Sequence, residues 1–216
     1  MSEPLLADLP AVATGESLAV KVPQVDTNDT PPAGLPAAPG DLYRAMPQPL
    51  VVFWQVRHPL DAICSLRVGI SQDWGHHPRP PDWWDWLHRP LVEQCAHHWA
   101  VINGPGYEFV RDVAVLNRFE DMIEDPHATA ARTVRSIGID PATVAAVLVT
   151  WSRRVQDTDN EFFVEAMTSR RHSRADHSRR VGRWRENLTA AEVAAVVPIV
   201  AHAASQFGYD LTSPAA

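Results

Sequence analysis

Lysine is nearly absent from this chain: Lys21 is the only one, and the other eighteen basic residues are Arg. Arg presents a planar fork of donors that suits carboxylate and phosphate groups, whereas the Lys ammonium acts as a compact point charge. Any site that needs a lysine, such as a lysine-containing phosphate loop, would therefore have to use Lys21.

Cysteine and long apolar runs are also scarce. Cys64 and Cys95 are too few for a disulfide framework and do not form a CxxC pair, which favours buried free thiols in a reducing compartment. The apolar stretches near 142–151 and 190–204 are too short or too interrupted to span a bilayer. The N-terminus is acidic and broken by proline, unlike a signal peptide. We expect a cytoplasmic protein with no membrane partner.

The chain has fewer basic than acidic residues, which disfavours nucleic-acid and membrane-surface partners. The formal net charge is −7, and the pI is near 5.8. General nucleic-acid or membrane-surface binding requires an excess of positive charge that this composition lacks. We therefore expect no nucleic-acid partner. With 216 residues, 45% of them hydrophobic, the chain can bury one ordinary domain core.

Proline sets the first 48 residues apart, because nine of the nineteen prolines lie before residue 50. We predict a proline-rich N-terminal segment over residues 1–48, irregular except for one short strand at 17–22 that ends at Pro23. The remainder, residues 49–210, is predicted to form one α/β domain.

Strand and helix patterns alternate through that domain. Residues 49–56 form a nearly unbroken apolar run, typical of a strand buried on both faces, and a second strand is expected at 110–117. Five helices are predicted, over residues 59–68, 91–102, 126–138, 141–154 and 189–208, the last with a capping box at 189–192. This order favours a parallel sheet with crossover helices, a three-layer α/β fold.

The junction between the first strand and its helix carries residues suited to an anion. Arg57 lies at the C-terminal end of the strand, where open α/β sheets place ligands, and Ser65 follows two turns into the helix. Guanidinium, hydroxyl and helix N-terminus together make a physically sensible phosphate site. The same residues fit a structural ion pair of Arg57 and a Ser65 that faces a neighbouring helix.

A second candidate is the strongly basic segment 168–185. A bound polyanion would explain its charge, and a solvated linker is the alternative. The segment contains one acid, Asp176, and seven Arg, which give it a net charge of +6 in an acidic protein. The seven are Arg170, Arg171, Arg174, Arg179, Arg180, Arg183 and Arg185.

Three segments resemble sulfotransferase motifs, in that family's order and spacing. Residues 56–65 resemble the 3′-phosphate-binding motif, Arg-x-Pro-x-Asp with a Ser eight residues after the Arg. Residues 117–126 are similar to the family's Arg-Tyr-Glu-Asp-Leu and Asp-Pro segment. Residues 177–189 resemble its C-terminal Arg-x-Gly-x-Trp loop, ahead of a last helix that ends in Gly208-Tyr209. The resemblance spans about residues 17–210.

The resemblance implies a P-loop-like sulfotransferase fold. The reaction would move a sulfuryl group from 3′-phosphoadenosine 5′-phosphosulfate (PAPS) to a hydroxyl or amine of a small-molecule or carbohydrate acceptor, and it requires no metal. Arg57 and Ser65 would hold the 3′-phosphate with help from Arg179 or Arg180. Gly182 would let the backbone approach the nucleotide.

The family's glycine-rich phosphosulfate loop has no counterpart before Arg57, where residues 14–17 are only weakly similar and lack the lysine. Neither a general base nor a leaving-group lysine is evident, so the catalytic residues stay unassigned. We therefore expect an N-terminally incomplete version of the fold. The alternatives to an active enzyme are a non-catalytic nucleotide- or anion-binding remnant, and one half of a split enzyme whose second chain supplies the loop.

Residues 71–99 are dense in Trp and His. Adjacent His residues on a helix point in different directions, which disfavours a zinc site. The resemblance favours an acceptor-binding loop with aromatic walls, in which His76 or His77 is a candidate base. Ordinary packing of Trp against a helix is the default interpretation. The five histidines of this region are His76, His77, His88, His97 and His98.

Overall fold

The computed structural model describes residues 50–69, 74, 79–108, 110–156 and 181–211. The predicted N-terminal segment 1–48, with its strand at 17–22, lies outside the described residues. So do Arg179, Arg180, His76 and His77.

Two parallel strands form the sheet of the described chain. β1 (Val52–Val56) pairs with β2 (Ala114–Arg118), and Gln55 lies opposite Asn117. Parallel strands need a crossover connection, which α3 (Pro59–Gly69) and α4 (Leu91–Glu108) supply. The structure is therefore mixed α/β and mostly helical, with a small parallel sheet.

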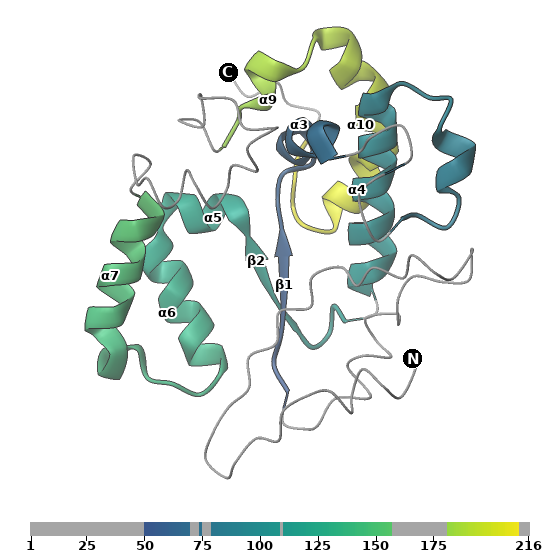
Figure 1. Cartoon of the computed structure of the whole chain (residues 1–216). Coiled ribbons are helices and arrows are strands. Elements are labelled where there is room, and N and C mark those ends of the chain that lie inside the picture. Colours follow the sequence, from purple (N-terminus) through teal and green to yellow (C-terminus); the bar gives the residue numbers. More distant parts are fainter. Residues whose placement is uncertain (1–49, 70–73, 75–78, 109, 157–180, 212–216) are drawn as a thin grey trace.

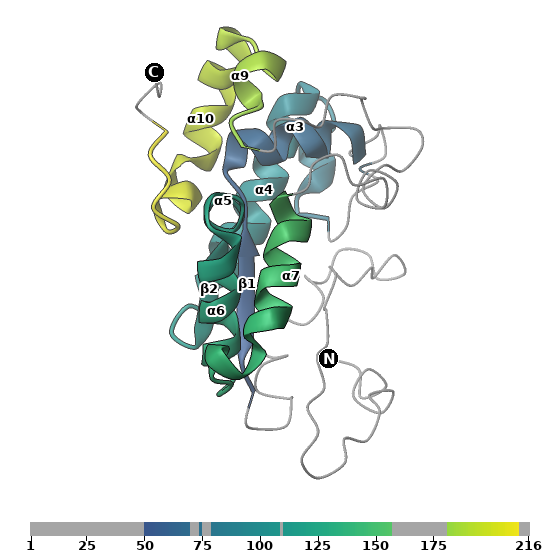
Figure 2. The same ribbon diagram turned by 90° about the vertical axis from the view of Figure 1, so that its left-hand side faces the viewer.

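Helices flank this sheet on both sides. α6 (Pro126–Ser136) and α7 (Ala145–Gln156) lie on one side, and α4 and α10 (Ala190–Ser205) pack together on the other (Figure 1). Figure 2, turned toward α6 and α7, shows these two helices in front of the strands. None of the helices in the described ranges has the length and apolar character needed to cross a bilayer.

Short helices complete the connections. α5 (Phe119–Glu124) follows β2 without a break, and α9 (Trp184–Asn187) precedes α10 beyond the C-terminal end of β1 (Figure 1). Two 3-10 turns, η1 (Trp83–Trp86) and η2 (Pro141–Val144), lead toward α4 and α7. The helix predicted over 141–154 is thus a 3-10 turn followed by an α-helix.

α4 and α10 pack closely together, and the end of α4 differs from the predicted one. The sequence predicts an end at residue 102, but α4 continues through Pro105 to Glu108. A Cβ on Gly104 would lie 3.2 Å from the Cβ of Ala203, so the two helices approach closely there. This packing outweighs the backbone hydrogen bond that Pro105 removes.

β1 is less buried than its apolar sequence predicts. Only Val56 is buried, Gln55 is exposed, and the rest of the strand is partly buried. The prediction of a strand buried on both faces is therefore wrong. One physical reason is that Phe53 and Gln55 line a cavity, shared with residues of α7, on one face of the strand. β2 also begins later than predicted, because residues 110–113 form a turn.

Local signals in the sequence set most helix ends. The Asp125 carboxylate accepts a hydrogen bond from the N–H of Ala128 at the start of α6. Gly138 and Gly208 have φ values of +82° and +72° just after α6 and α10, a conformation that favours glycine. These ends agree with the predicted ones within a few residues.

The predicted capping box of α10 is confirmed. Thr189 Oγ1 accepts from the Glu192 N–H (3.2 Å), and Glu192 Oε2 accepts from the Thr189 N–H (2.7 Å). Thr189→Ala should lower the free energy of unfolding by about 1 kcal/mol, because a first-turn N–H loses its acceptor. Denaturant unfolding measures the change. Thr150→Ala, at an exposed position of α7, is the matched control and should change stability by less than about 0.5 kcal/mol; equal losses would contradict the role of the box.

Candidate functional site

Arg57 and Ser65 lie together at the C-terminal end of β1. Arg57 Nη1 donates to Ser65 Oγ across 3.3 Å. The Arg57 guanidinium packs over the Phe119 ring, 4.7 Å from its centroid. The Arg57 carbonyl accepts from Trp99 Nε1 of α4 at 3.2 Å. The structure thus brings together the two residues predicted to bind phosphate, and it holds Arg57 at both its backbone and its side chain.

The Arg57 cation at this junction is partly shielded from water and has charges of both signs nearby. Burial lowers the pKa of the half-buried Arg57 guanidinium; nearby Asp61 opposes this shift and Arg183 adds to it. Arg keeps its charge at neutral pH even so. Ser65 is exposed beside it. A fixed cation, a second Arg in its field and an accessible hydroxyl can receive a multivalent anion.

Asp61 connects this junction to the C-terminal loop. Its side chain is fully buried, and its two oxygens accept hydrogen bonds from the backbone N–H groups of Gly182 (2.7 Å) and Trp184 (3.0 Å). Gly182 has a φ of +77°, which favours glycine. The sequence analysis assigned Asp61 no partner in the site. The position of Asp61 in the Arg-x-Pro-x-Asp pattern was the signal that could have indicated a role in the site.

Glu120 brings the second motif to the same place. One carboxylate oxygen accepts from the backbone N–H of His58 (2.8 Å), and the other accepts from the Tyr209 hydroxyl (2.6 Å). Burial, followed by this bond, raises the pKa of Tyr209. All three motifs that resemble sulfotransferase segments therefore meet around residues 57–61, and the sequence reasoning did not assign Glu120 or Tyr209.

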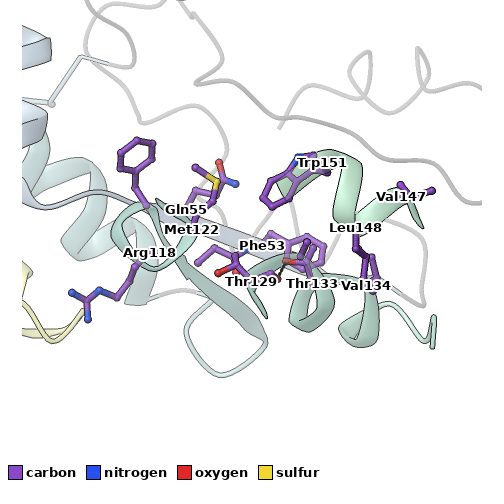
Figure 3. Close-up of a pocket in the computed structure, with 13 residues that line it drawn as sticks. Phe53, Gln55, Arg118, Met122, Thr129, Thr133, Val134, Val147, Leu148 and Trp151 are labelled. Carbon is purple, nitrogen blue, oxygen red and sulfur yellow. Dashed lines mark hydrogen bonds between the residues drawn. The ribbon is translucent and has the colours of Figure 1, made fainter. Parts of the chain in front are cut away.

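A cavity of about 430 Å³ is lined in part by Phe119, the residue over which Arg57 packs, and Figure 3 shows its lining. Phe53 and Gln55 line it from the sheet face that also carries Arg57, since alternate strand residues share a face. Arg118 turns its guanidinium away from the cavity in Figure 3. Phe119 contributes to the lining and also contacts Arg57, so the cavity and the cation are neighbours. The remaining lining residues come from β2 and the helices α5, α6 and α7: Asn117, Met122, Thr129, Ala130, Thr133, Val134, Val147, Leu148 and Trp151.

The described part of the Trp- and His-rich region packs on α4. His97 Nε2 lies 2.7 Å from Asp82 Oδ1, and the His97 ring stacks on Trp86 with centroids 4.0 Å apart. His98 Nδ1 accepts from Trp74 Nε1 at 3.2 Å. The two adjacent histidines contact different partners, as predicted, and Trp74 and Trp86 pack against them, whereas Trp84 is exposed. Among the residues that the structure describes, no group of three or more His, Cys, Asp or Glu is placed to hold a metal ion.

Comparison of the chain with models of protein families, with curated proteins and with solved structures finds no match.

Proposed function

We propose that this chain binds the 3′-phosphate of an adenine nucleotide at Arg57 and Ser65 and acts as a PAPS-dependent sulfotransferase. One observation carries the proposal: Arg57 Nη1 and Ser65 Oγ, eight residues apart in sequence, lie 3.3 Å from each other at the C-terminal end of a parallel strand. The proposal includes the three-layer P-loop-like fold that the motifs imply, of which the two strands and their crossover would be part.

The hydrogen-bonding state of the neighbouring carboxylate supports a phosphate ligand. Asp61 lies close enough to influence the Arg57 guanidinium. Both of its oxygens already accept backbone N–H groups, from Gly182 and Trp184. The Arg57–Ser65 bond joins two groups that can each donate to a phosphate oxygen. An incoming phosphate can therefore replace a long, exposed bond by charge-assisted ones.

The adjoining cavity supports a nucleotide over inorganic phosphate. Its lining is mostly apolar and includes three aromatic rings, Phe53, Phe119 and Trp151. A flat purine base can stack on such rings. Because Phe119 contacts Arg57, a base in the cavity and a phosphate on Arg57 could belong to one ligand. We place the adenine of PAPS there.

In the proposed reaction, an acceptor oxygen or nitrogen attacks the sulfur atom of PAPS. The bond from sulfur to the 5′-phosphate oxygen breaks, 3′-phosphoadenosine 5′-phosphate leaves, and the acceptor proton passes to a base. Arg57, Ser65 and the loop at Gly182 would hold the donor in place, which lowers the barrier by fixing the reacting groups. Arg179 and Arg180 would add charge to the same phosphate.

A non-catalytic nucleotide- or anion-binding remnant, or one half of a split sulfotransferase, is the second candidate. The absence of a glycine-rich loop before Arg57 in the sequence favours it. All these candidates bind a 3′-phosphate, and only an active enzyme converts PAPS to 3′-phosphoadenosine 5′-phosphate in the presence of an acceptor. Product formation by the purified chain therefore separates the enzyme from the other two.

Calorimetric titration tests the nucleotide site. We expect 3′-phosphoadenosine 5′-phosphate to bind at least about tenfold more tightly than adenosine 5′-phosphate, since a hydrogen bond to a charged group contributes about 1.5–3 kcal/mol. Cytidine 3′,5′-bisphosphate is the matched probe for the base and should bind more weakly than the adenine compound. Equal affinity for the two adenine nucleotides, or no binding of either, would overturn the proposal.

A further inference from the structure

An aromatic and cationic row lies beside the proposed phosphate site. The His58 ring is between the indole of Trp184, with centroids 6.2 Å apart and planes 4° apart, and the phenol of Tyr209, at 5.2 Å and 76°. Arg185 packs over the Trp184 ring at 4.8 Å, and Arg118 packs over the Tyr209 ring at 4.5 Å. In order of contact, the row consists of Arg185, Trp184, His58, Tyr209 and Arg118.

His58 connects the parts of the site without belonging to the proposed phosphate contacts. Its backbone N–H donates to Glu120, which also accepts from Tyr209. Its ring packs against the Trp184 ring, and the backbone N–H of Trp184 donates to Asp61. Nδ1 of the His58 ring is buried and has no hydrogen-bond partner among the described residues. The imidazole therefore contributes packing, with no described group positioned to accept a proton from Nδ1.

The surroundings favour the neutral imidazole. Burial lowers the pKa of His58; Asp61 and Glu120 oppose the shift, while Arg185 and Arg118 add to it. Both carboxylates already accept hydrogen bonds from other groups. A protonated His58 would be a third cation in a row whose two aromatic rings each already contact an Arg.

We propose that His58 is a positioning residue that makes nucleotide binding dependent on pH: the neutral imidazole holds Trp184, and with it the loop at Gly182, against the Arg57 site, and protonation releases this loop. The inference rests on the proposed function for its link to the nucleotide. The Asp61 carboxylate binds the backbone N–H groups of Gly182 and Trp184, and the His58 ring packs on the Trp184 indole.

The direction of the effect follows from the lowered pKa. With the loop closed, His58 has a pKa below its ordinary value near 6.5, and with the loop open it returns toward that value. The contribution of the neutral imidazole to closure is therefore present above about pH 6.5 and is lost as the pH falls below that value. Between about pH 7.5 and about pH 5.5, the closed population relative to the open one should fall by up to about tenfold.

Amide hydrogen exchange of the ligand-free chain tests the loop directly. After correction for intrinsic exchange rates, protection of the Gly182 and Trp184 amides should fall by up to about tenfold on acidification. His58→Gln, which keeps a neutral side chain throughout, should abolish that dependence. His202→Gln, at an exposed position of α10, is the matched control and should behave like the natural chain. His58→Asn serves as a second neutral variant if His58→Gln does not fold.

Affinity for 3′-phosphoadenosine 5′-phosphate at the same two pH values tests the link to binding. Its phosphates also titrate near pH 6, but they do so equally with every variant, so the comparison is between the natural chain and His58→Gln. We expect the natural chain to lose more affinity, by the factor by which its closed fraction falls. If protection of the two amides does not change with pH, or changes equally in His58→Gln, the role of His58 is overturned. A lack of nucleotide binding at both pH values would overturn the proposed function. The exchange result alone would then decide whether His58 holds the loop at Gly182.

Discussion

Asp61→Ala should lower the free energy of unfolding by about 3 kcal/mol or more, the largest stability change expected at the site. The fully buried carboxylate accepts two backbone N–H groups from the C-terminal loop, at Gly182 and Trp184. Each hydrogen bond to a charged acceptor contributes about 1.5–3 kcal/mol, and the substitution leaves both donors without their acceptor. Denaturant unfolding of the whole chain measures the loss.

Two further variants make the test specific. Asp61→Asn keeps the shape of the side chain and one acceptor oxygen, so it should lose roughly half as much stability. Asp112→Ala also removes one negative charge, from a side chain that is 94% exposed, and should change stability by less than about 0.5 kcal/mol. If Asp61→Ala is no more harmful than Asp112→Ala, the carboxylate does not hold the loop.

The parts of the fold that depend on neighbouring residues could be predicted from the sequence. α3 begins at Pro59, and α10 begins after Thr189, because a proline in the first turn and a capping box act within one helical turn. The two strands could be placed because each is a short apolar run before a charged or polar junction. Their parallel pairing followed from the helices between them.

Features that depend on distant residues could not be predicted. The continuation of α4 through Pro105 is fixed by the close approach of Gly104 to Ala203, about a hundred residues away in the chain. The incomplete burial of β1 depends on where α7 lies relative to Phe53. Periodicity and propensity report only on the residues next to each other in sequence, so neither effect leaves a local signal.

The candidate site divides in the same way. Arg57 and Ser65 could be paired from the sequence because they lie at the end of one strand and on the helix that follows. The bonds of Asp61 to Gly182 and of Glu120 to Tyr209 join positions far apart in sequence. A carboxylate in a motif indicates that some donor is needed, and only the tertiary structure identifies that donor.

Arg57→Ala should weaken the binding of 3′-phosphoadenosine 5′-phosphate by about 100-fold, because loss of one partner of a hydrogen-bonded charge pair costs about 2–5 kcal/mol. The affinity for adenosine 5′-phosphate should change little, because that nucleotide has no 3′-phosphate. Arg57→Lys keeps the charge but loses the planar fork and its packing on Phe119. We expect it to bind about tenfold more weakly than the natural chain, between Ala and Arg.

Because the Arg57 side chain also packs on Phe119 and bonds to Ser65, its removal changes the structure as well as the charge. Denaturant unfolding of Arg57→Ala shows whether the variant is folded at the temperature of the titration. Arg111→Ala, which removes an Arg whose side chain is 61% exposed, is the matched control and should bind both nucleotides as the natural chain does. An equal loss of affinity for both nucleotides in a folded Arg57→Ala would show that Arg57 does not contact the 3′-phosphate. A selective loss for the bisphosphate would assign that phosphate to Arg57, since the two ligands differ only there.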